Sequence, residues 1–156
     1  MDTLEELKKQ RAELDKKIEE LESICQPFDR FQKYYLLTTY GGVTKQIYDD
    51  YNIHINNVGQ GNAFHTEQEA ELEAERRSLL HRFKMFMDKC NAGWKDNFHR
   101  NQIRYYIDFS DSEDELFINS TFYKTFELFG YFKNEEDCDK AIDLFGDEIK
   151  RLYVEV

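Results

Sequence analysis

Acidic side chains gather at two places in the last third of the sequence, and they suit the binding of positive charges better than catalysis. The stretch DFSDSEDE contributes Asp108, Asp111, Glu113, Asp114 and Glu115. The stretch NEEDCDKAID contributes Glu135, Glu136, Asp137, Asp139 and Asp143. Carboxylates bind lysine and arginine side chains through charge-assisted hydrogen bonds. These ten acids are therefore the predicted partner-binding residues.

Each acidic stretch also has a plainer interpretation. The first would serve as a solvated turn, and Glu135, Glu136 and Asp137 would be stabilised by the dipole of a helix that begins there. DFSDSEDE alternates oxygen donors, but it lacks the central glycine and the twelve-residue spacing of a calcium loop. We therefore predict no metal site.

The sequence contains no motif with the spacing of a catalytic centre. The four histidines never form an HExxH or HxH pattern; they are His54, His65, His81 and His99. Cys90 and Cys138 fall on predicted helices, where a buried thiol is the usual role. The stretch GQGN lacks the lysine and the Ser or Thr of a phosphate-binding loop. These patterns predict neither enzymatic activity nor a cofactor.

The net charge of −11 is unevenly distributed along the chain. Residues 101–156 contain fourteen acidic and six basic residues, a net charge of −8. Such a surface repels phosphate backbones and attracts basic protein clefts. We therefore expect a protein partner and no direct binding of nucleic acid, although acidity of this size also serves solubility.

The composition indicates a folded, water-soluble chain. Aromatic residues make up 15% of the sequence, which is too many for a disordered protein. No apolar run approaches the roughly 20 residues of a membrane-spanning helix, so no membrane association is predicted. The three cysteines form no CxxC pair, which favours a reducing cytoplasm over a disulfide framework.

Residues 1–26 have the heptad pattern of a coiled coil. Leucines recur every seven residues at Leu7, Leu14 and Leu21, and the companion positions are Leu4, Arg11, Ile18 and Cys25. The pattern predicts a helix that forms a homodimer, with Lys17 and Glu22 paired across two parallel copies. The alternative is a helix that folds back onto its own domain. Pro27 is expected to end the helix.

Two similar modules are predicted after this helix, at residues 31–92 and 93–156. In the first, a hairpin turns at Gly41-Gly42, and a third short strand is expected at residues 51–55. A helix from Thr66 to about Cys90 follows, with Thr66 and Glu69 spaced as a capping box.

The second module repeats this plan with a strand at residues 103–109, an acidic connection, another strand, and a helix after Asn134. The corresponding pairs are Phe64 and Phe132, Thr66 and Asn134, Glu69 and Asp137, and Ala70 and Cys138. The predicted fold class is α+β: an N-terminal coiled-coil-like helix followed by two similar antiparallel β-hairpin/sheet plus helix modules.

The pattern of these modules resembles a family of small proteins encoded by phages and prophages of Gram-positive bacteria. The resemblance covers most of residues 31–153 and rests on Tyr34, Tyr35, Phe64, Thr66, Glu69, Ala70, Trp94, Lys95, Tyr105, Tyr106, Gly130, Phe132, Ala141, Phe145, Gly146, Asp147, Glu148 and Ile149. Asp96 replaces a proline of that pattern, and Cys138 replaces an alanine.

A phage origin implies that the chain acts in the cytoplasm of a bacterial host. We therefore expect an inhibitor of a host defence nuclease, such as an anti-CRISPR protein that mimics DNA and occupies the basic channel of a Cas9-type effector. The alternative is an oligomeric phage module that binds another protein or a small signalling nucleotide. A basic pocket for the nucleotide would come from Arg76, Arg77, Arg82 and Lys84.

Overall fold

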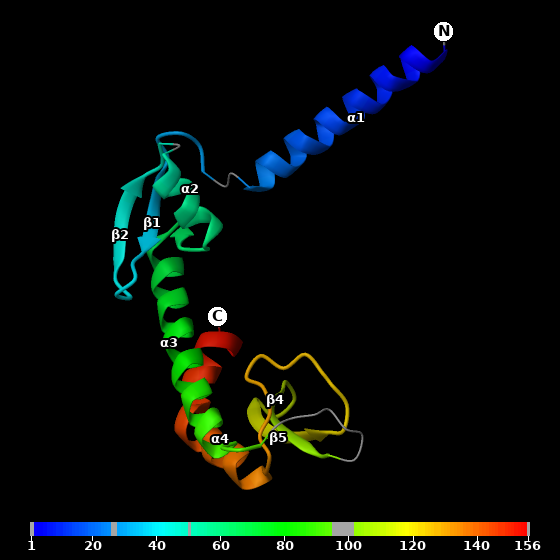
Figure 1. Cartoon of the computed structure of the whole chain (residues 1–156). Helices are drawn as coiled ribbons and strands as arrows, with labels where there is room; N and C mark the ends of the chain where they lie inside the picture. The colour runs from blue at the N-terminus through cyan, green and yellow to red at the C-terminus, as the bar shows by residue number, and fades with distance from the viewer. Residues whose placement is uncertain (1, 26–27, 50, 95–101, 156) are drawn as a thin grey trace. The chain divides into compact units, whose positions relative to one another are not determined.

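The computed structural model describes residues 2–25, 28–49, 51–94 and 102–155 (Figure 1). Its described residues form four α-helices and two antiparallel sheets, which confirms the predicted α+β class. The chain divides into two compact units, Met1–Ala74 and Glu75–Val156. The predicted boundaries at residues 26, 31 and 92 stay predictions. The predictions made for the Glu22 and Cys25 side chains, and for Pro27, Lys95, Asp96 and His99, lie outside the described part.

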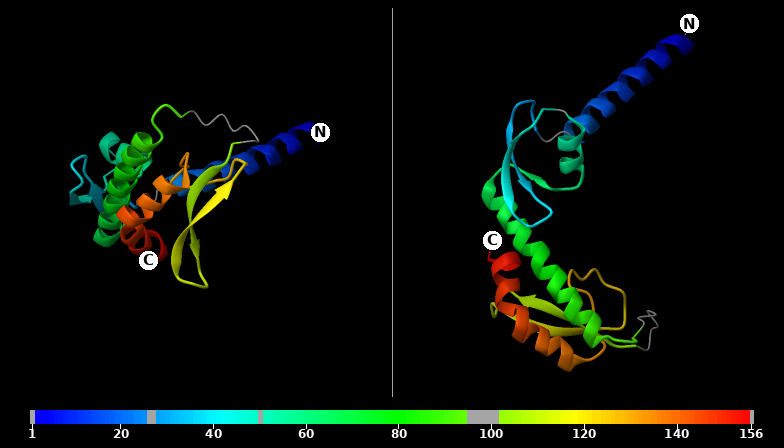
Figure 2. Two further views of the ribbon diagram at one scale, coloured as in Figure 1. Left: turned by 90° about the horizontal axis from the view of Figure 1, so that it is seen from below. Right: turned by 60° about the vertical axis from the view of Figure 1, so that its left-hand side comes forward.

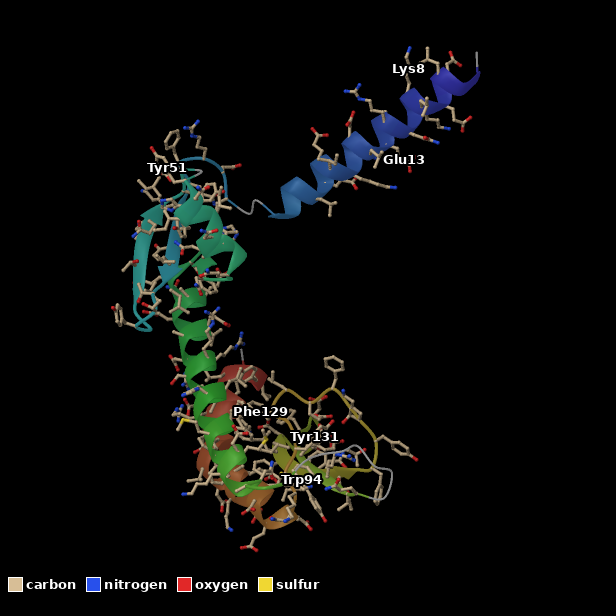
Figure 3. The ribbon with its side chains drawn as sticks, viewed as in Figure 1. Lys8, Glu13, Tyr51, Trp94, Phe129 and Tyr131 are labelled. Carbon is tan, nitrogen blue, oxygen red and sulfur yellow. The ribbon has the colours of Figure 1, made fainter. Side chains whose placement is uncertain are left out.

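The first helix, α1, spans Asp2–Cys25. Its described side chains, residues 4–21, are all exposed, as the labelled Lys8 and Glu13 illustrate (Figure 3). Ion pairs one turn apart support it, because opposite charges at this spacing stabilise a helix. They join Arg11 to Asp15, Lys16 to Glu20, and Lys17 to Glu13. Lys17 therefore has a partner within its own helix.

The remainder of unit 1 contains a three-stranded antiparallel sheet with the order β2-β1-β3. Its strands are β1 (Lys33–Leu37), β2 (Val43–Ile47) and β3 (Ala63–Phe64). β1 and β2 form the predicted hairpin, in which Leu37 pairs with Val43 across a turn that contains the two glycines. β3 pairs with the other edge of β1, where Phe64 lies opposite Tyr35.

The predicted third strand at residues 51–55 is wrong, because the chain forms a helix there, α2 (Asn52–Gly59). The alternation of Tyr51, Ile53 and Ile55 had indicated a strand, but all three side chains are exposed. His54 and Val58 are instead partly covered, and they are spaced four residues apart. The buried face of this segment therefore follows a helical period.

Aromatic side chains form the core of unit 1. Phe28, Tyr34 and Tyr48 are buried together, with the ring centroids of Phe28 and Tyr34 5.4 Å apart. The hydroxyl oxygen of Tyr34 lies 2.7 Å from Nδ1 of His54, and Nε2 of His54 lies 3.1 Å from Oδ1 of Asp49. A neutral His54 satisfies both contacts when its Nε2–H donates to Asp49 and its Nδ1 accepts from Tyr34.

Helix α3 spans Glu67–Cys90, as predicted within one residue at its start. The backbone N–H of Glu69 donates to Oγ1 of Thr66 at 3.2 Å, and the backbone N–H of Thr66 donates to Oε2 of Glu69 at 3.2 Å. This reciprocal pair is the predicted capping box.

Unit 2 contains a two-stranded antiparallel ribbon that packs against α4, the helix Glu135–Ile149 (Figure 2). The strands are β4 (Arg104–Ser110) and β5 (Glu115–Thr121), and the last residue of β4, Ser110, pairs with Glu115. Phe132 forms an isolated bridge with Tyr105 of β4. Asn134 caps α4 by accepting the backbone N–H of Asp137 at 2.9 Å. A π-helical segment, η1 (Lys150–Val154), follows α4.

The core of unit 2 lies where the second half of α3 meets α4. The ring of Phe83 lies 5.4 Å from that of Phe145 and 5.8 Å from that of Phe132, measured between centroids. Cys138 and Ala141 are fully buried on α4. The small side chains allow α4 to pack closely on its neighbours, and the aromatic rings fill the remaining space.

Candidate acidic binding site

The four-residue turn between β4 and β5 is held against the end of α4. Asp114 takes a left-handed backbone conformation with φ of 55°, which Asp adopts more readily than most residues. Nζ of Lys150 donates to the backbone oxygen of Asp114 at 2.6 Å and to its Oδ2 at 3.2 Å. The predicted acid Asp114 therefore has a structural role, because its charge and its backbone fix the position of the turn.

An acidic groove of about 340 Å³ lies between this turn and α4. Its lining consists of Asp114, Glu115, Leu116, Ile142, Asp143, Gly146, Asp147 and Lys150. Four carboxylates thus face one lysine within the groove. Two of them come from the hairpin and two from α4, so packing joins the two acidic stretches of the sequence in one site.

Three other predicted acids lie on the same turn and the same helix as the groove residues. Asp111 and Glu113 are exposed on the turn that precedes Asp114. Asp139 is exposed on α4 four residues before Asp143, which places the two carboxylates on one helix face. These three side chains are exposed to solvent but are not among the described residues that line the groove.

The acids in the first turn of α4 form a separate group. Lys140 pairs with Oε1 of Glu136 at 2.9 Å and with Oδ1 of Asp137 at 3.3 Å, and hydrogen bonds from these two carboxylates raise the pKa of Lys140. Glu135 is exposed beside them. None of Glu135, Glu136 and Asp137 is among the described residues that line the groove.

The carboxylate of Asp108 accepts hydrogen bonds within the two-stranded sheet of β4 and β5. Its Oδ2 accepts from the side-chain amide of Asn119 on β5 at 3.1 Å, and its Oδ1 accepts from the backbone N–H of Phe109 at 2.9 Å. The side chain is only partly exposed. Its carboxylate therefore joins the two strands and is less accessible to a partner than the acids of the turn.

Sequence reasoning missed two charged residues of the groove, Asp147 and Lys150. Asp147 follows Asp143 by four residues and Lys150 follows Asp147 by three, so helical spacing alone would have placed all three on one face. Leu116, Ile142 and Gly146 add apolar surface to the lining of the groove, which the sequence did not indicate.

The thiols of Cys90 and Cys138 have raised pKa values, and the basic side chains of Arg82 and Lys84 form ion pairs with acids. Burial raises the pKa of the Cys138 thiol to about 12, and burial also raises the pKa of Cys90, so both stay protonated near neutral pH. Nη2 of Arg82 lies 2.6 Å from Oε1 of Glu148, and Nζ of Lys84 lies 2.8 Å from Oδ2 of Asp88. Among the described residues, no group of three or more His, Cys, Asp or Glu side chains has the geometry of a metal site.

Substitutions at Asp114 separate its backbone role from its charge. Asp114→Asn keeps a residue that tolerates the left-handed conformation, and we expect it to lower the free energy of unfolding by less than about 0.5 kcal/mol, since exposed ion pairs contribute little. Asp114→Val places a β-branched side chain at the same φ, and we expect a loss of about 1–2 kcal/mol. Urea denaturation measures the free energy of unfolding of both variants. Equal stability of the two would show that the turn does not constrain this position.

Comparisons with known proteins give no family to which the chain can be assigned. No protein-family model, curated protein or solved structure matches it. Within the described ranges, no helix has both the length and the apolar character needed to cross a membrane. We therefore infer function from the residues, geometry and charge of the acidic groove.

Proposed function

We propose that this chain is a phage-encoded inhibitor of a host defence nuclease, most simply an anti-CRISPR protein, and that its acidic groove binds basic side chains of the nuclease. One observation carries the proposal. Asp114 and Glu115 of the hairpin share a groove with Asp143 and Asp147 of α4, and Lys150 is the one cation among the described lining residues. Carboxylates that converge in this way offer several acceptors to one arginine or lysine cluster.

The charge of the last third of the chain supports this role. Residues 101–156 have a net charge of −8, which creates a negative potential around the groove. Effectors of the Cas9 type hold nucleic acid in a positively charged channel and read a short duplex motif with arginines. A folded polyanionic surface would compete for the same cations, and the competition would weaken as salt screens the charges.

The exposed acids of the groove and of the turn beside it have the leading role in this proposal. Asp111, Glu113, Glu115 and Asp143 are all exposed, whereas Asp114 is already paired with Lys150. Asp139 lies one helical turn before Asp143 on α4 and adds another exposed carboxylate. Glu135 and Glu136 would form a second and weaker contact at the start of α4, and Asp108 would act by holding the hairpin together.

Reversal of four exposed charges tests the proposal. The variant combines Asp111→Lys, Glu113→Lys, Glu115→Lys and Asp143→Lys, and spares Asp114 because of its structural role. We expect it to compete with duplex DNA for a purified Cas9-type effector at least about thirtyfold less well, which corresponds to about 2 kcal/mol. Fluorescence anisotropy of labelled DNA, measured at two salt concentrations, reports the competition.

A matched control separates the groove from net charge. It combines Glu5→Lys, Glu6→Lys, Glu19→Lys and Glu71→Lys, which reverse four exposed acids outside unit 2 and change the net charge equally. We expect this control to compete nearly as well as the unmodified chain, and thermal unfolding should show that both variants are folded. An equal loss in the two variants would contradict a specific role for the groove.

The second candidate function is an oligomeric phage module that binds another protein. The observation that favours it is the apolar stripe of α1, whose leucine side chains are largely exposed. Exposed apolar surface of this kind marks interaction sites. For a nucleotide ligand the support is weaker, because Arg82 and Lys84 each pair with an acid of unit 2.

We also propose that the two hairpin-plus-helix parts are copies of one plan. Two observations support this. In each part an aromatic residue pairs with the first strand of the hairpin just before a capped helix, namely Phe64 with Tyr35 and Phe132 with Tyr105. In each part a glycine with positive φ precedes that aromatic residue; these are Gly61 and Gly130.

A further inference from the structure

The apolar side chains of α1 form a stripe with regular heptad spacing, and they are largely exposed. Its five apolar members have exposed fractions of 49–62%, and they are Leu4, Leu7, Leu14, Ile18 and Leu21. A helix of 24 residues is about 36 Å long, so the stripe extends over most of that length. In a coiled coil, a second helix with the same heptad pattern covers an apolar stripe of this kind.

The charges beside the stripe decide which partner fits. On one flank, a charged residue follows each leucine of the stripe; Lys8, Asp15 and Glu22 follow Leu7, Leu14 and Leu21, so this flank carries one positive and two negative charges. A helix with such a flank complements a second copy of itself when the two run in opposite directions, because Lys8 of each copy then lies opposite Asp15 of the other. The pattern therefore selects a second copy of this chain as the occupant.

Arg11 distinguishes parallel from antiparallel pairing of two copies of α1. It occupies a stripe position, and its side chain is 84% exposed and paired with Asp15 at 3.7 Å. Two parallel copies in register would place Arg11 directly opposite Arg11 of the second copy, which brings like charges together. Two antiparallel copies with Leu4 opposite Leu21 would place Arg11 opposite Leu14, where its long aliphatic stem can pack while the guanidinium reaches Asp15.

We propose that α1 pairs with α1 of a second copy as an antiparallel two-helix coiled coil, with Leu4 in the layer of Leu21 and Leu7 in the layer of Ile18. This direction differs from the parallel pairing predicted from Lys17 and Glu22. It also places the ends of the two helices that lead to the acidic remainder of each chain at opposite ends of the pair. The pairing is independent of any binding by the acidic groove.

The oligomeric state is the first test. Light scattering after size-exclusion chromatography should give twice the chain mass of 18.8 kDa for the full-length protein. Leu14→Glu should reduce the mass to that of one chain, because it places a charge in the centre of the stripe. Ala12→Glu is the matched control, since it adds the same charge on the outer face of α1 and should leave the dimer intact. A single-chain mass for the unmodified protein at about 100 μM, well above the concentrations at which specific complexes dissociate, would overturn the proposal.

Cysteine cross-linking then tests the direction. In a Cys25→Ser background, Leu4→Cys and Leu21→Cys are prepared separately and treated with a short bismaleimide, alone and mixed. Cys138 is buried and Cys90 is partly exposed, so the background variant alone is treated in parallel to control for the reaction of both thiols. We expect a cross-linked dimer in the mixture and none with either variant alone. Cross-linking of Leu21→Cys with itself, or a dimer without any mixed cross-link, would overturn the antiparallel arrangement.

Discussion

Phe132→Ala is expected to lower the free energy of unfolding of unit 2 by about 3–5 kcal/mol. The side chain is fully buried, and its ring packs against those of Phe83 and Phe86 with centroid distances of 5.8 and 6.2 Å. Its backbone hydrogen bonds to Tyr105 would persist in the alanine variant. The loss would therefore come from the cavity and from the missing aromatic contacts. It is a large part of the 5–15 kcal/mol by which a typical domain is stable.

Phe126→Ala is the matched control for this prediction. Phe126 has the same side chain but is completely exposed, so its removal should change stability by no more than about 0.5 kcal/mol. Urea denaturation gives the free energies, and hydrogen exchange of the β4 and β5 amides shows whether unit 2 is the part affected. Equal stability of the two variants would contradict the placement of Phe132 at the centre of this core.

Tyr34→Ala is expected to destabilise unit 1 to a similar extent, about 3–5 kcal/mol. Tyr34 is fully buried, and its ring lies 5.4 Å from that of Phe28 and 5.7 Å from that of His54. Tyr34→Phe removes only the hydroxyl that lies 2.7 Å from Nδ1 of His54. We expect this variant to lose about 1–2 kcal/mol, because a partly buried ring nitrogen would be left without its hydrogen-bond partner.

Tyr40 provides the control for Tyr34, since its side chain is 98% exposed. Tyr40→Ala should leave the protection of the β1 and β2 amides unchanged in hydrogen exchange, whereas Tyr34→Ala should reduce it strongly. If the two tyrosine variants exchanged at the same rate, Tyr34 would not be a core residue. A Tyr34→Phe variant as unstable as Tyr34→Ala would assign the effect to the hydroxyl and not to the ring.

The sequence predicted those elements whose signals are local. The hairpin at Gly41-Gly42 and the capped starts of α3 and α4 depend on residues within a few positions of one another, and all three are confirmed. The strand prediction at residues 51–55 failed because Ile53 and Ile55 alternate in the sequence although the segment is helical and both side chains are exposed. Local propensity is overridden in such segments by the side chains that the core covers.

The candidate site was predicted only in part, because the acidic groove is formed by tertiary packing. The acids at Glu115 and Asp143 were identified from charge, but their proximity depends on how α4 packs against β5. The same packing brings Lys150 to Asp114, which are 36 residues apart in the sequence. The sequence could not indicate this pair, since charge patterns alone do not fix which helix face meets the sheet.

Helix α3 packs against residues that the ribosome synthesises much later than α3 itself. Phe83 is covered by Phe145, and Arg76 donates to the backbone oxygen of Leu152, a residue 76 positions later. At roughly 5–20 residues per second, the ribosome needs several seconds to supply these later partners. During that interval the nascent helix presents an uncovered aromatic face, so chains that terminate early should aggregate or recruit chaperones, whereas completed chains should not.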